Sequence, residues 1–377
     1  MACIVAIVYT YAGYPLLLAV GAWLRPTPPS PPRHFPRATV LVAAHDEEAS
    51  IEQCIRAVLS SEYPSGLLDM IVVSDASTDR TNGIVSCIED ARLRLVPLAP
   101  RQGKDAALMA VRDAAAGAIL ILMDASTVVE RTTLARLVRH FHDPRVGAVS
   151  GRKTVHGDRS SVARSDGMYW DYDSALRSME SRTGSSGVGV EGGLFAIRKE
   201  YFTLQHGRGA AADLSLGFRV AAAGLRNLYE PAAVFRESAS RDMGTEFKRK
   251  IRVIVRGMRA FFLHWRLLNP IARPGLVFQV VSHKLLRWLV PFFLLGLFGC
   301  CLLSTVSVLR VMLVAQVGFY AAAVSGLVLG TRAAGVPVVT IPAYFCAMNG
   351  AALISWFLLS RRFDIWAPTR RIIRPCG

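Results

Sequence analysis

Two acidic residues occupy positions where a carboxylate could bind a nucleotide or a metal ion. Asp75 ends the apolar segment Val-Val-Ser-Asp, directly after a predicted strand, where its carboxylate could accept hydrogen bonds from a base or a ribose. The residue could equally be a turn residue, or belong with its neighbours to a cap of the next helix. The sequence alone leaves both interpretations of Asp75 open.

Asp124 stands at the tip of a second apolar segment, in Leu-Met-Asp-Ala-Ser, and Ser126 follows two residues later. A carboxylate at this position could hold a divalent cation against a diphosphate, with the Ser126 hydroxyl as a neutral ligand. Mg²⁺ and Mn²⁺ favour such oxygen ligands and keep water and phosphate in their coordination shell. The alternative is again a strand-end turn in which Asp124 acts as a cap.

Strands and helices that alternate along residues 38–150 must position these acids. Short apolar segments indicate strands at 39–43, 70–73, 93–98, 118–123 and 146–150, and helical spacing indicates helices at 47–59, 81–88, 104–115 and 132–141. Such alternation predicts right-handed βαβ units and a parallel sheet. Ligands bind at the carboxyl ends of strands in sheets of this kind, which is where both acids stand.

The following segment changes character. Residues 151–209 read as irregular, with a Gly- and Ser-rich stretch at 181–193 that is typical of substrate loops. A helix is predicted at 213–223 and another at 247–262. The latter carries Lys248, Arg252, Arg256 and Arg259 at helical spacing opposite apolar residues, a pattern that suits a helix lying on a membrane surface.

Four uncharged stretches, 1–24, 288–309, 311–331 and 333–360, are each long enough to cross about 30 Å of hydrocarbon as a helix. The chain therefore reads as an integral membrane protein. The first stretch could be a signal peptide, but it has no basic start and is longer than usual, which favours a retained anchor. A proline-rich linker at 25–37 ends this helix.

The sequence is strongly basic, with 44 Lys and Arg against 28 Asp and Glu and a formal charge of +16. Positive charge beside membrane spans marks the cytoplasmic side and binds anionic lipids. No nucleic-acid-binding motif accompanies the charge, so membrane lipids are the expected partner and nucleic acid is not.

Several short motifs together resemble the inverting family-2 glycosyltransferases, which have the GT-A fold. No single motif is specific, but their order and spacing are, and the resemblance covers about residues 38–260. The matching pieces are Ala-Ala-His-Asp-Glu-Glu (43–48), Tyr-Pro (63–64), Ser-Asp-Ala-Ser-Thr-Asp (74–79), Gly-Lys (103–104), Met-Asp-Ala-Ser (123–126), Gly-Gly-Leu-Phe-Ala-Ile-Arg (192–198) and Ala-Asp-Leu-Ser-Leu-Gly-Phe-Arg (212–219).

This resemblance implies an α/β domain with a mostly parallel, Rossmann-like sheet, one transmembrane helix before it and about three after it. The GT-A domain would span 38–245, with a nucleotide-binding half at 38–150 and an acceptor half at 151–245. A membrane-interface region (246–284), transmembrane helices (285–360) and a basic tail (361–377) would follow.

The resemblance also implies a role for each matching residue. Asp75 would contact the base or ribose, Glu47 would lie near the base, and Lys104 would neutralise phosphate. Asp124, with Ser126, would bind Mg²⁺ or Mn²⁺, and Asp213 would be the general base.

The implied reaction moves a sugar from a nucleotide donor, expected to be a UDP-sugar, to a lipid-linked or glycan acceptor with inversion. Arg256 could reach the diphosphate of the donor, although Arg252 and Arg256 could instead bind only lipid headgroups.

Three departures from the family pattern keep other functions open. Ser126 replaces the usual second carboxylate, and Ala212 stands where many members have an acid before the base. The Gln-x-x-Arg-Trp motif of processive synthases is absent, and Arg252-Val-Ile-Val-Arg256-Gly257 resembles the version in non-processive relatives. The alternatives are a processive polysaccharide synthase and an inactive scaffold protein with this fold.

The membrane topology contains a conflict. An N-terminus outside the cell places the catalytic domain in the cytosol, at a bacterial inner membrane, and three further spans then place the C-terminus outside. The arginines of the tail, however, favour the inside. Either one apolar stretch is interfacial or re-entrant, or the charge rule does not hold here. Residues 275–286 are also expected to be partly embedded.

Overall fold

The computed structural model describes residues 1–25, 32, 34–156, 161–187, 189–204, 209–238, 243–330 and 336–361. Most of the predicted linker and nearly all of the basic tail lie outside these residues. An eight-stranded sheet forms the centre of the water-exposed part, with the strand order β3-β2-β1-β4-β7-β6-β8-β5. The strands are β1 (Ala38–Ala44), β2 (Leu68–Asp75), β3 (Leu93–Leu98), β4 (Ile119–Asp124), β5 (Val128–Val129), β6 (Val146–His156), β7 (Leu194–Arg198) and β8 (Arg226–Ser238).

The sheet has two parts. β3, β2, β1 and β4 are parallel to one another, and the apolar sequences of β1, β2 and β4, which are buried on both faces, are typical of a parallel sheet. β7 runs antiparallel to both β4 and β6, so it separates this part from the second parallel pair, β6 and β8. The predicted strand at 146–150 is therefore confirmed, but it is longer than expected and does not neighbour the first four strands.

Helices cover both faces of the sheet. Helices α3 (Ile51–Leu59), α4 (Thr81–Ser86) and α6 (Thr133–Val138) pack on one face, and α5 (Lys104–Arg112) and α8 (Ala212–Ala222) pack on the other. Alternate residues of β1 point to opposite faces, so Val40 and Val42 belong to the first core and Leu41 and Ala43 to the second. Two apolar cores therefore hold the sheet rigid along the edge where β1, β2 and β4 end.

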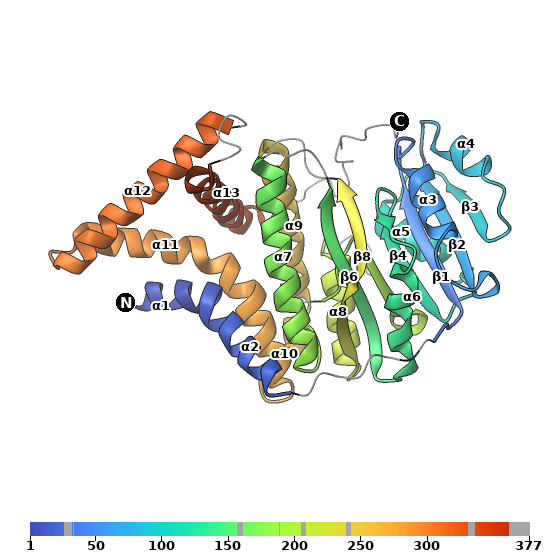
Figure 1. Ribbon diagram of the computed structural model, residues 1–377, viewed down its shortest axis with the longest axis horizontal. Coiled ribbons are helices and arrows are strands. Elements are labelled where there is room, and N and C mark those ends of the chain that lie inside the picture. Colours follow the sequence, from blue (N-terminus) through green and yellow to red (C-terminus); the bar gives the residue numbers. More distant parts are fainter. Residues whose placement is uncertain are drawn as a thin grey trace.

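Two long helices, α7 (Ser161–Arg182) and α9 (Met243–Leu263), lie between the β6–β8 side of the sheet and the membrane helices (Figure 1). The prediction that residues 151–209 are irregular is therefore wrong, because this segment contains the end of β6, all of α7 and β7. α7 packs Tyr172, Leu176 and Met179 against Tyr14 and Leu18 of the first helix of the chain. Polar residues share its buried positions, namely Asp166, Asp173, Arg177 and Glu180.

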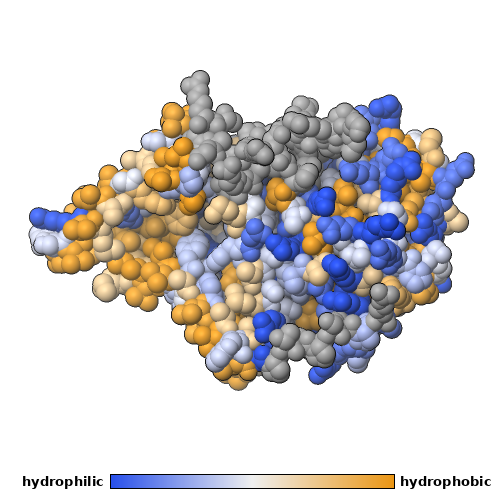
Figure 2. All heavy atoms as spheres, in the orientation of Figure 1, coloured by the Kyte–Doolittle hydropathy of each residue, from blue (hydrophilic) through white to orange (hydrophobic). Residues whose placement is uncertain are grey.

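Four helices are long and apolar enough to cross a membrane: Ala2–Trp23, Pro274–Leu303, Ser307–Leu329 and Pro337–Leu358. The first consists of α1 (Ala2–Val8), a π-helical turn (Tyr9–Gly13) and α2 (Tyr14–Trp23). The second consists of α10 (Pro274–Val280), a π-helical turn (Val281–Leu285) and α11 (Leu286–Leu303). α12 (Ser307–Leu329) and α13 (Pro337–Leu358) follow. Their apolar surface is concentrated at one end of the molecule (Figure 2), which fits an integral membrane protein.

Candidate active site

The ends of β1, β2 and β4 form one edge of the sheet. The strand register pairs Ala43 with Asp124 and Ala44 with Ser74, so the segments after all three strands leave the sheet at the same level. A cavity of about 1110 Å³ opens at this edge and continues between α7 and α9 to the membrane helices. Of the predicted site residues, Glu47, Lys104, Asp124, Ser126, Asp213 and Arg256 line the cavity.

Asp75 lies at the same edge but is not part of the cavity lining. It is fully buried at the end of β2, and its two carboxylate oxygens accept hydrogen bonds from the backbone N–H groups of Gln102 and Gly103, each at 2.7 Å. Gly103 has a positive φ of 91° and directly precedes α5. Asp75 therefore fixes the turn that begins α5. Its predicted contact with a base or ribose stays a prediction.

Lys104 is the first residue of α5, and its ammonium group is bound to the Asp124 carboxylate. Burial lowers the pKa of Lys104, but the attraction of Asp124 and the hydrogen bond outweigh it and hold the pKa above its ordinary value. A positive group and a carboxylate thus stand together at the tip of β4. Glu47, which receives a hydrogen bond of 2.7 Å from the Ser50 hydroxyl, lines the same end of the cavity.

β7 brings Glu191 into the site. The antiparallel pairing of Met123 with Leu194 places the segment before β7 beside the tip of β4, and the Asp124 N–H faces the Gly193 carbonyl at 3.4 Å. A Cβ on Gly193 would come within 2.3 Å of the Glu237 carboxylate, so only glycine leaves room for this close approach. Burial raises the pKa of Glu191, and the nearby Arg177 and Lys153 only partly offset this effect.

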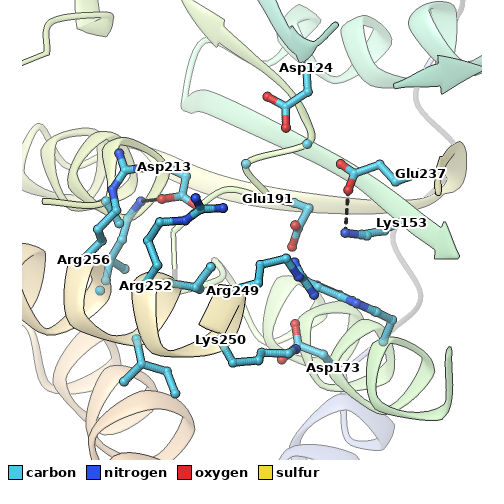
Figure 3. Close-up of a pocket in the computed structure, with 18 of the residues that line it drawn as sticks. Asp124, Lys153, Asp173, Glu191, Asp213, Glu237, Arg249, Lys250, Arg252 and Arg256 are labelled. Atoms are coloured by element: carbon cyan, nitrogen blue, oxygen red, sulfur yellow. Dashed lines mark hydrogen bonds and ion pairs between the residues drawn. The ribbon is translucent and has the colours of Figure 1, made fainter. Parts of the chain in front are cut away.

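Asp213 is the second residue of α8, and one carboxylate oxygen accepts a hydrogen bond of 2.9 Å from the Leu214 N–H. A Cβ on Gly192 would lie 3.0 Å from the other oxygen, so Asp213 packs closely against the segment that carries Glu191. The Ala211 N–H donates to the Arg256 carbonyl at 2.9 Å, which ties the start of α8 to α9. Figure 3 shows Asp213 on the side of the cavity where Arg252 and Arg256 project from α9.

The basic residues of α9 do not form an exposed face. Arg249, Lys250, Arg252 and Arg256 all line the cavity (Figure 3), and Lys250 is buried. Arg256 lies 3.7 Å from the Asp105 carboxylate on α5, and its buried Nε has no hydrogen-bond partner in the described part of the chain. Both predicted roles of Arg252 and Arg256, binding the diphosphate and binding lipid headgroups, stay predictions. The membrane-interface assignment of 246–284 stays a prediction.

Residues that the sequence pattern does not single out complete the middle of the cavity. Lys153 donates to the Glu237 carboxylate at 2.6 Å, and both side chains are buried. The ammonium groups of Lys153 and Lys250 also lie over the Trp170 ring, at 4.6 and 5.3 Å from its centre. Two ammonium groups thus contact the Trp170 ring in the wall of the cavity.

The end of the cavity near the membrane helices contains a buried network of charged residues. His283 lies between two carboxylates of α7, with Nε2 at 2.9 Å from Asp173 and Nδ1 at 2.7 Å from Glu180. Arg177 donates to Asp173 at 2.6 Å. Burial alone would raise the pKa of Asp173, but Arg177 and His283 hold it well below its ordinary value. α7 is therefore joined by charge to the helix that contains His283.

The described part of the cavity offers few side chains that could bind a metal ion. Among the described residues, no three His, Cys, Asp or Glu side chains are grouped so that they could hold an ion. Asp124 and Ser126 both line the cavity, however, and Asp124 already binds a cationic group from the cavity, the Lys104 ammonium. This donor set fits a divalent ion whose other ligands are diphosphate and water.

The mixed sheet, its covering helices and the cavity at its strand ends define a GT-A-type domain attached to membrane helices. The family model for Glycosyl transferase family 2 matches residues 39–221. Residues 39–221 therefore belong to glycosyl transferase family 2.

Relatives and solved structures agree with this assignment. Poly-beta-1,6-N-acetyl-D-glucosamine synthase of Staphylococcus aureus (strain COL) is 25% identical over 221 residues, which are 57% of this chain and 53% of the synthase. The protein named "Probable glycosyltransferase YdaM" of Bacillus subtilis (strain 168) is 32% identical over 129 residues, 33% of this chain and 31% of that protein. The chain thus spans about half the length, or less, of the curated relatives that it matches.

One solved structure is similar over nearly the whole chain. It is the mannosyltransferase PcManGT from Pyrobaculum calidifontis, in complex with GDP-Man and Mn²⁺, with a TM-score of 0.70 and 25% identity over 94% of this chain and 98% of that one. The similarity therefore extends beyond the GT-A domain to the membrane helices.

Proposed function

We propose that the protein is a membrane glycosyltransferase that transfers a sugar from a nucleoside-diphosphate sugar to a lipid-linked or glycan acceptor. One observation carries the proposal. A single cavity joins the Lys104–Asp124 pair at the sheet edge to Asp213 and then to the membrane helices. It thus has a cationic end for a diphosphate, a carboxylate in the middle and an approach from the membrane.

In this proposal, the positive groups of Lys104 and Arg256 bind the diphosphate and stabilise the charge that develops when it leaves. A divalent ion, Mg²⁺ or Mn²⁺, held by Asp124 and Ser126 would supply further positive charge to the same group when bound. PcManGT, whose structure contains Mn²⁺, supports this metal dependence. The sheet cores hold the backbone at Asp124 and at the turn before Lys104, so that only these two side chains have to exchange partners when donor and metal bind.

Asp213 would take the proton from the acceptor hydroxyl, whose oxygen attacks the anomeric carbon as the bond to the diphosphate breaks. A single displacement from the opposite face inverts the configuration. The family resemblance of the sequence predicts a UDP-sugar as donor, whereas the PcManGT structure contains GDP-Man. Donors with either nucleotide therefore belong in the first screen.

A processive polysaccharide synthase is the second candidate, because the curated relatives include a poly-N-acetylglucosamine synthase. The Gln-x-x-Arg-Trp motif of processive synthases is missing, which argues against this candidate. The described chain also has only four helices that could span a membrane, which are few for building a polymer channel. The lengths of products made from a radiolabelled donor distinguish the two, since long chains support the synthase.

The proposed location is a bacterial inner membrane with the GT-A domain in the cytosol, where nucleotide sugars are made. The bacterial origin of the curated relatives supports it. Cysteine labelling of loops on intact cells and on lysed cells tests this orientation.

The decisive experiment is a donor screen on the full chain, purified in detergent with Mg²⁺ or Mn²⁺. We expect Asp213→Asn to lower donor turnover at least a hundredfold while nucleotide affinity stays within about twofold, because loss of a general base costs 10²–10⁴-fold. No turnover of any donor by the unmodified protein, or full turnover by Asp213→Asn, would refute the proposal. The first of these results would favour the inactive scaffold.

A further inference from the structure

Two basic side chains at the membrane end of the cavity keep donor groups that no described acid binds. Arg177, Lys284 and Arg287 line this end, together with the buried His283. From these free donor groups, we propose that the cavity has a second anion site, formed by Lys284 and Arg287, that binds the phosphate or diphosphate headgroup of a lipid-linked acceptor. This inference rests on the proposed function, since it assigns the acceptor class to the same cavity.

The acids of this region are already bound. Asp173 accepts hydrogen bonds from Arg177 Nε at 2.6 Å, and it contacts His283 at 2.9 Å and Arg287 Nη1 at 3.2 Å. Glu180 accepts a hydrogen bond of 2.5 Å from the Tyr14 hydroxyl and contacts the other nitrogen of His283. Both ring nitrogens of His283 thus face carboxylates of α7.

Two donors remain after this pairing. Arg287 Nη2 is buried and has no hydrogen-bond partner in the described part of the chain. The Lys284 ammonium makes no hydrogen bond or ion pair with any residue that the structure describes, although longer-range interactions connect it with Arg177, Asp173 and Glu191. The Lys284 ammonium and the Arg287 Nη2 group lie on consecutive turns of one helix, both at the cavity, and are thus placed to bind an anion.

The position of these donors along the helix indicates what carries the anion. The helix Pro274–Leu303 has 30 residues and is about 45 Å long, more than the roughly 30 Å of hydrocarbon. α11, from Leu286 onward, has 18 residues and by itself spans about 27 Å. The part of the helix from Leu286 onward is thus long enough to cross most of the hydrocarbon, which would leave Lys284 and Arg287 at the level of lipid headgroups.

The surroundings also suit a lipid. Apolar residues of α11 and α13 line the cavity next to this end, namely Trp288, Ile341, Phe345, Met348 and Ala352. They offer an apolar path from the bilayer for the tail of the acceptor. The site is distinct from the donor end, because Asp124 and Asp173 occupy opposite ends of the cavity in Figure 3, with Glu191 between them. The lipid anion would thus anchor the acceptor while its sugar hydroxyl reaches Asp213.

The test uses the full chain in a neutral detergent and three probes, which are farnesyl phosphate, farnesol and inorganic phosphate. We expect the unmodified protein to bind farnesyl phosphate at least tenfold more tightly than either farnesol or inorganic phosphate. Lys284→Gln should remove about tenfold of this preference, since one charge-assisted contact to phosphate is lost. Lys284→Arg should keep it. Lys248→Gln, which removes the same charge from an exposed position on α9, is the matched control.

Each outcome has a distinct meaning. Equal binding of farnesyl phosphate and farnesol by the unmodified protein overturns the anion site, even if Lys284→Gln fails to fold. Equal binding of inorganic phosphate and farnesyl phosphate overturns the assignment to a lipid. Nucleotide affinity and donor turnover, measured on the same samples, report on the proposed function separately. A protein that turns over a donor but ignores farnesyl phosphate keeps the function and loses this inference.

Discussion

Replacing Asp75 with asparagine tests whether this residue acts on the nucleotide directly or through the turn before α5. The two carboxylate oxygens each accept one backbone N–H, from Gln102 and Gly103, at 2.7 Å. Asparagine has one acceptor oxygen, and its NH₂ group would face the second N–H. At least one hydrogen bond to a charged group is then lost, and such a bond contributes about 1.5–3 kcal/mol.

A loss of about 2 kcal/mol corresponds to a factor of about 30 in the local opening equilibrium. We therefore expect hydrogen exchange at the amides of Gln102 and Gly103 to become roughly 30-fold faster in Asp75→Asn, in the absence of any nucleotide. Nucleotide affinity should fall as well, because Lys104 follows this turn. Peptide-level exchange measured by mass spectrometry, together with nucleotide titration, provides both values.

Asp69→Asn is the matched control, since it makes the same chemical change at the other end of β2, where Asp69 accepts a hydrogen bond from Thr39. It should leave exchange at residues 102 and 103 unchanged. Unchanged exchange in Asp75→Asn, combined with weaker nucleotide binding, would refute the positioning role and support a direct contact with base or ribose.

Three further predictions concern stability. Lys153→Met leaves the buried Glu237 without the ammonium at 2.6 Å, so the free energy of unfolding should fall by about 3–5 kcal/mol in denaturant titrations; a loss below 1 kcal/mol would contradict the buried pair. Gly193→Ala puts a Cβ within 2.3 Å of the Glu237 carboxylate and 2.7 Å of the Phe235 ring. The free energy of unfolding should fall by about 1–3 kcal/mol, and sugar transfer should be reduced. Gly275→Ala, which has open space around its Cβ, is the control and should leave the free energy of unfolding unchanged. Glu230 is buried, yet hydrogen bonds from His140 and Arg139 lower its pKa to about 2, below its value in the unfolded chain. The stabilising contribution of Glu230 is therefore complete above about pH 4.5 and is lost as the pH falls towards 2. We expect the melting temperature of Glu230→Gln to lie below that of the unmodified protein at pH 7 and to approach it at low pH. A difference in melting temperature that stays constant from pH 7 to pH 3 would contradict this role of Glu230.

The first half of the sheet could be predicted from the sequence because its strands are buried on both faces. Segments such as Ala38–Ala44 and Ile119–Asp124 are almost entirely apolar, so their ends, and the acids that follow, can be located without coordinates. The structure confirms that Asp124 and Asp213 share one cavity. It also shows what a linear pattern cannot, namely that both oxygens of Asp75 bind backbone groups.

α7 is hard to predict from apolar periodicity, because charged residues share its buried positions with a short apolar stripe around Leu176. Asp166, Trp170, Asp173, Arg177 and Glu180 follow one another at spacings of three and four residues, which is the spacing of a helix face. A search for charged residues at this spacing could have found the helix. Their partners, such as His283 and Tyr344, are more than 100 residues away, so the cost of burying each charge is offset only in the folded chain.

The contact of His283 with both Asp173 and Glu180 has a consequence for the order in which the protein is made. Two buried acids of the early-synthesised domain are bound by an imidazole on a helix that leaves the ribosome about 100 residues later. The domain can therefore reach its final arrangement only once the second hydrophobic helix has been inserted into the bilayer. Maturation of the enzyme is in this way tied to its delivery to the membrane, and we expect a chain that stops before Pro274 to leave Asp173 and Glu180 without this imidazole.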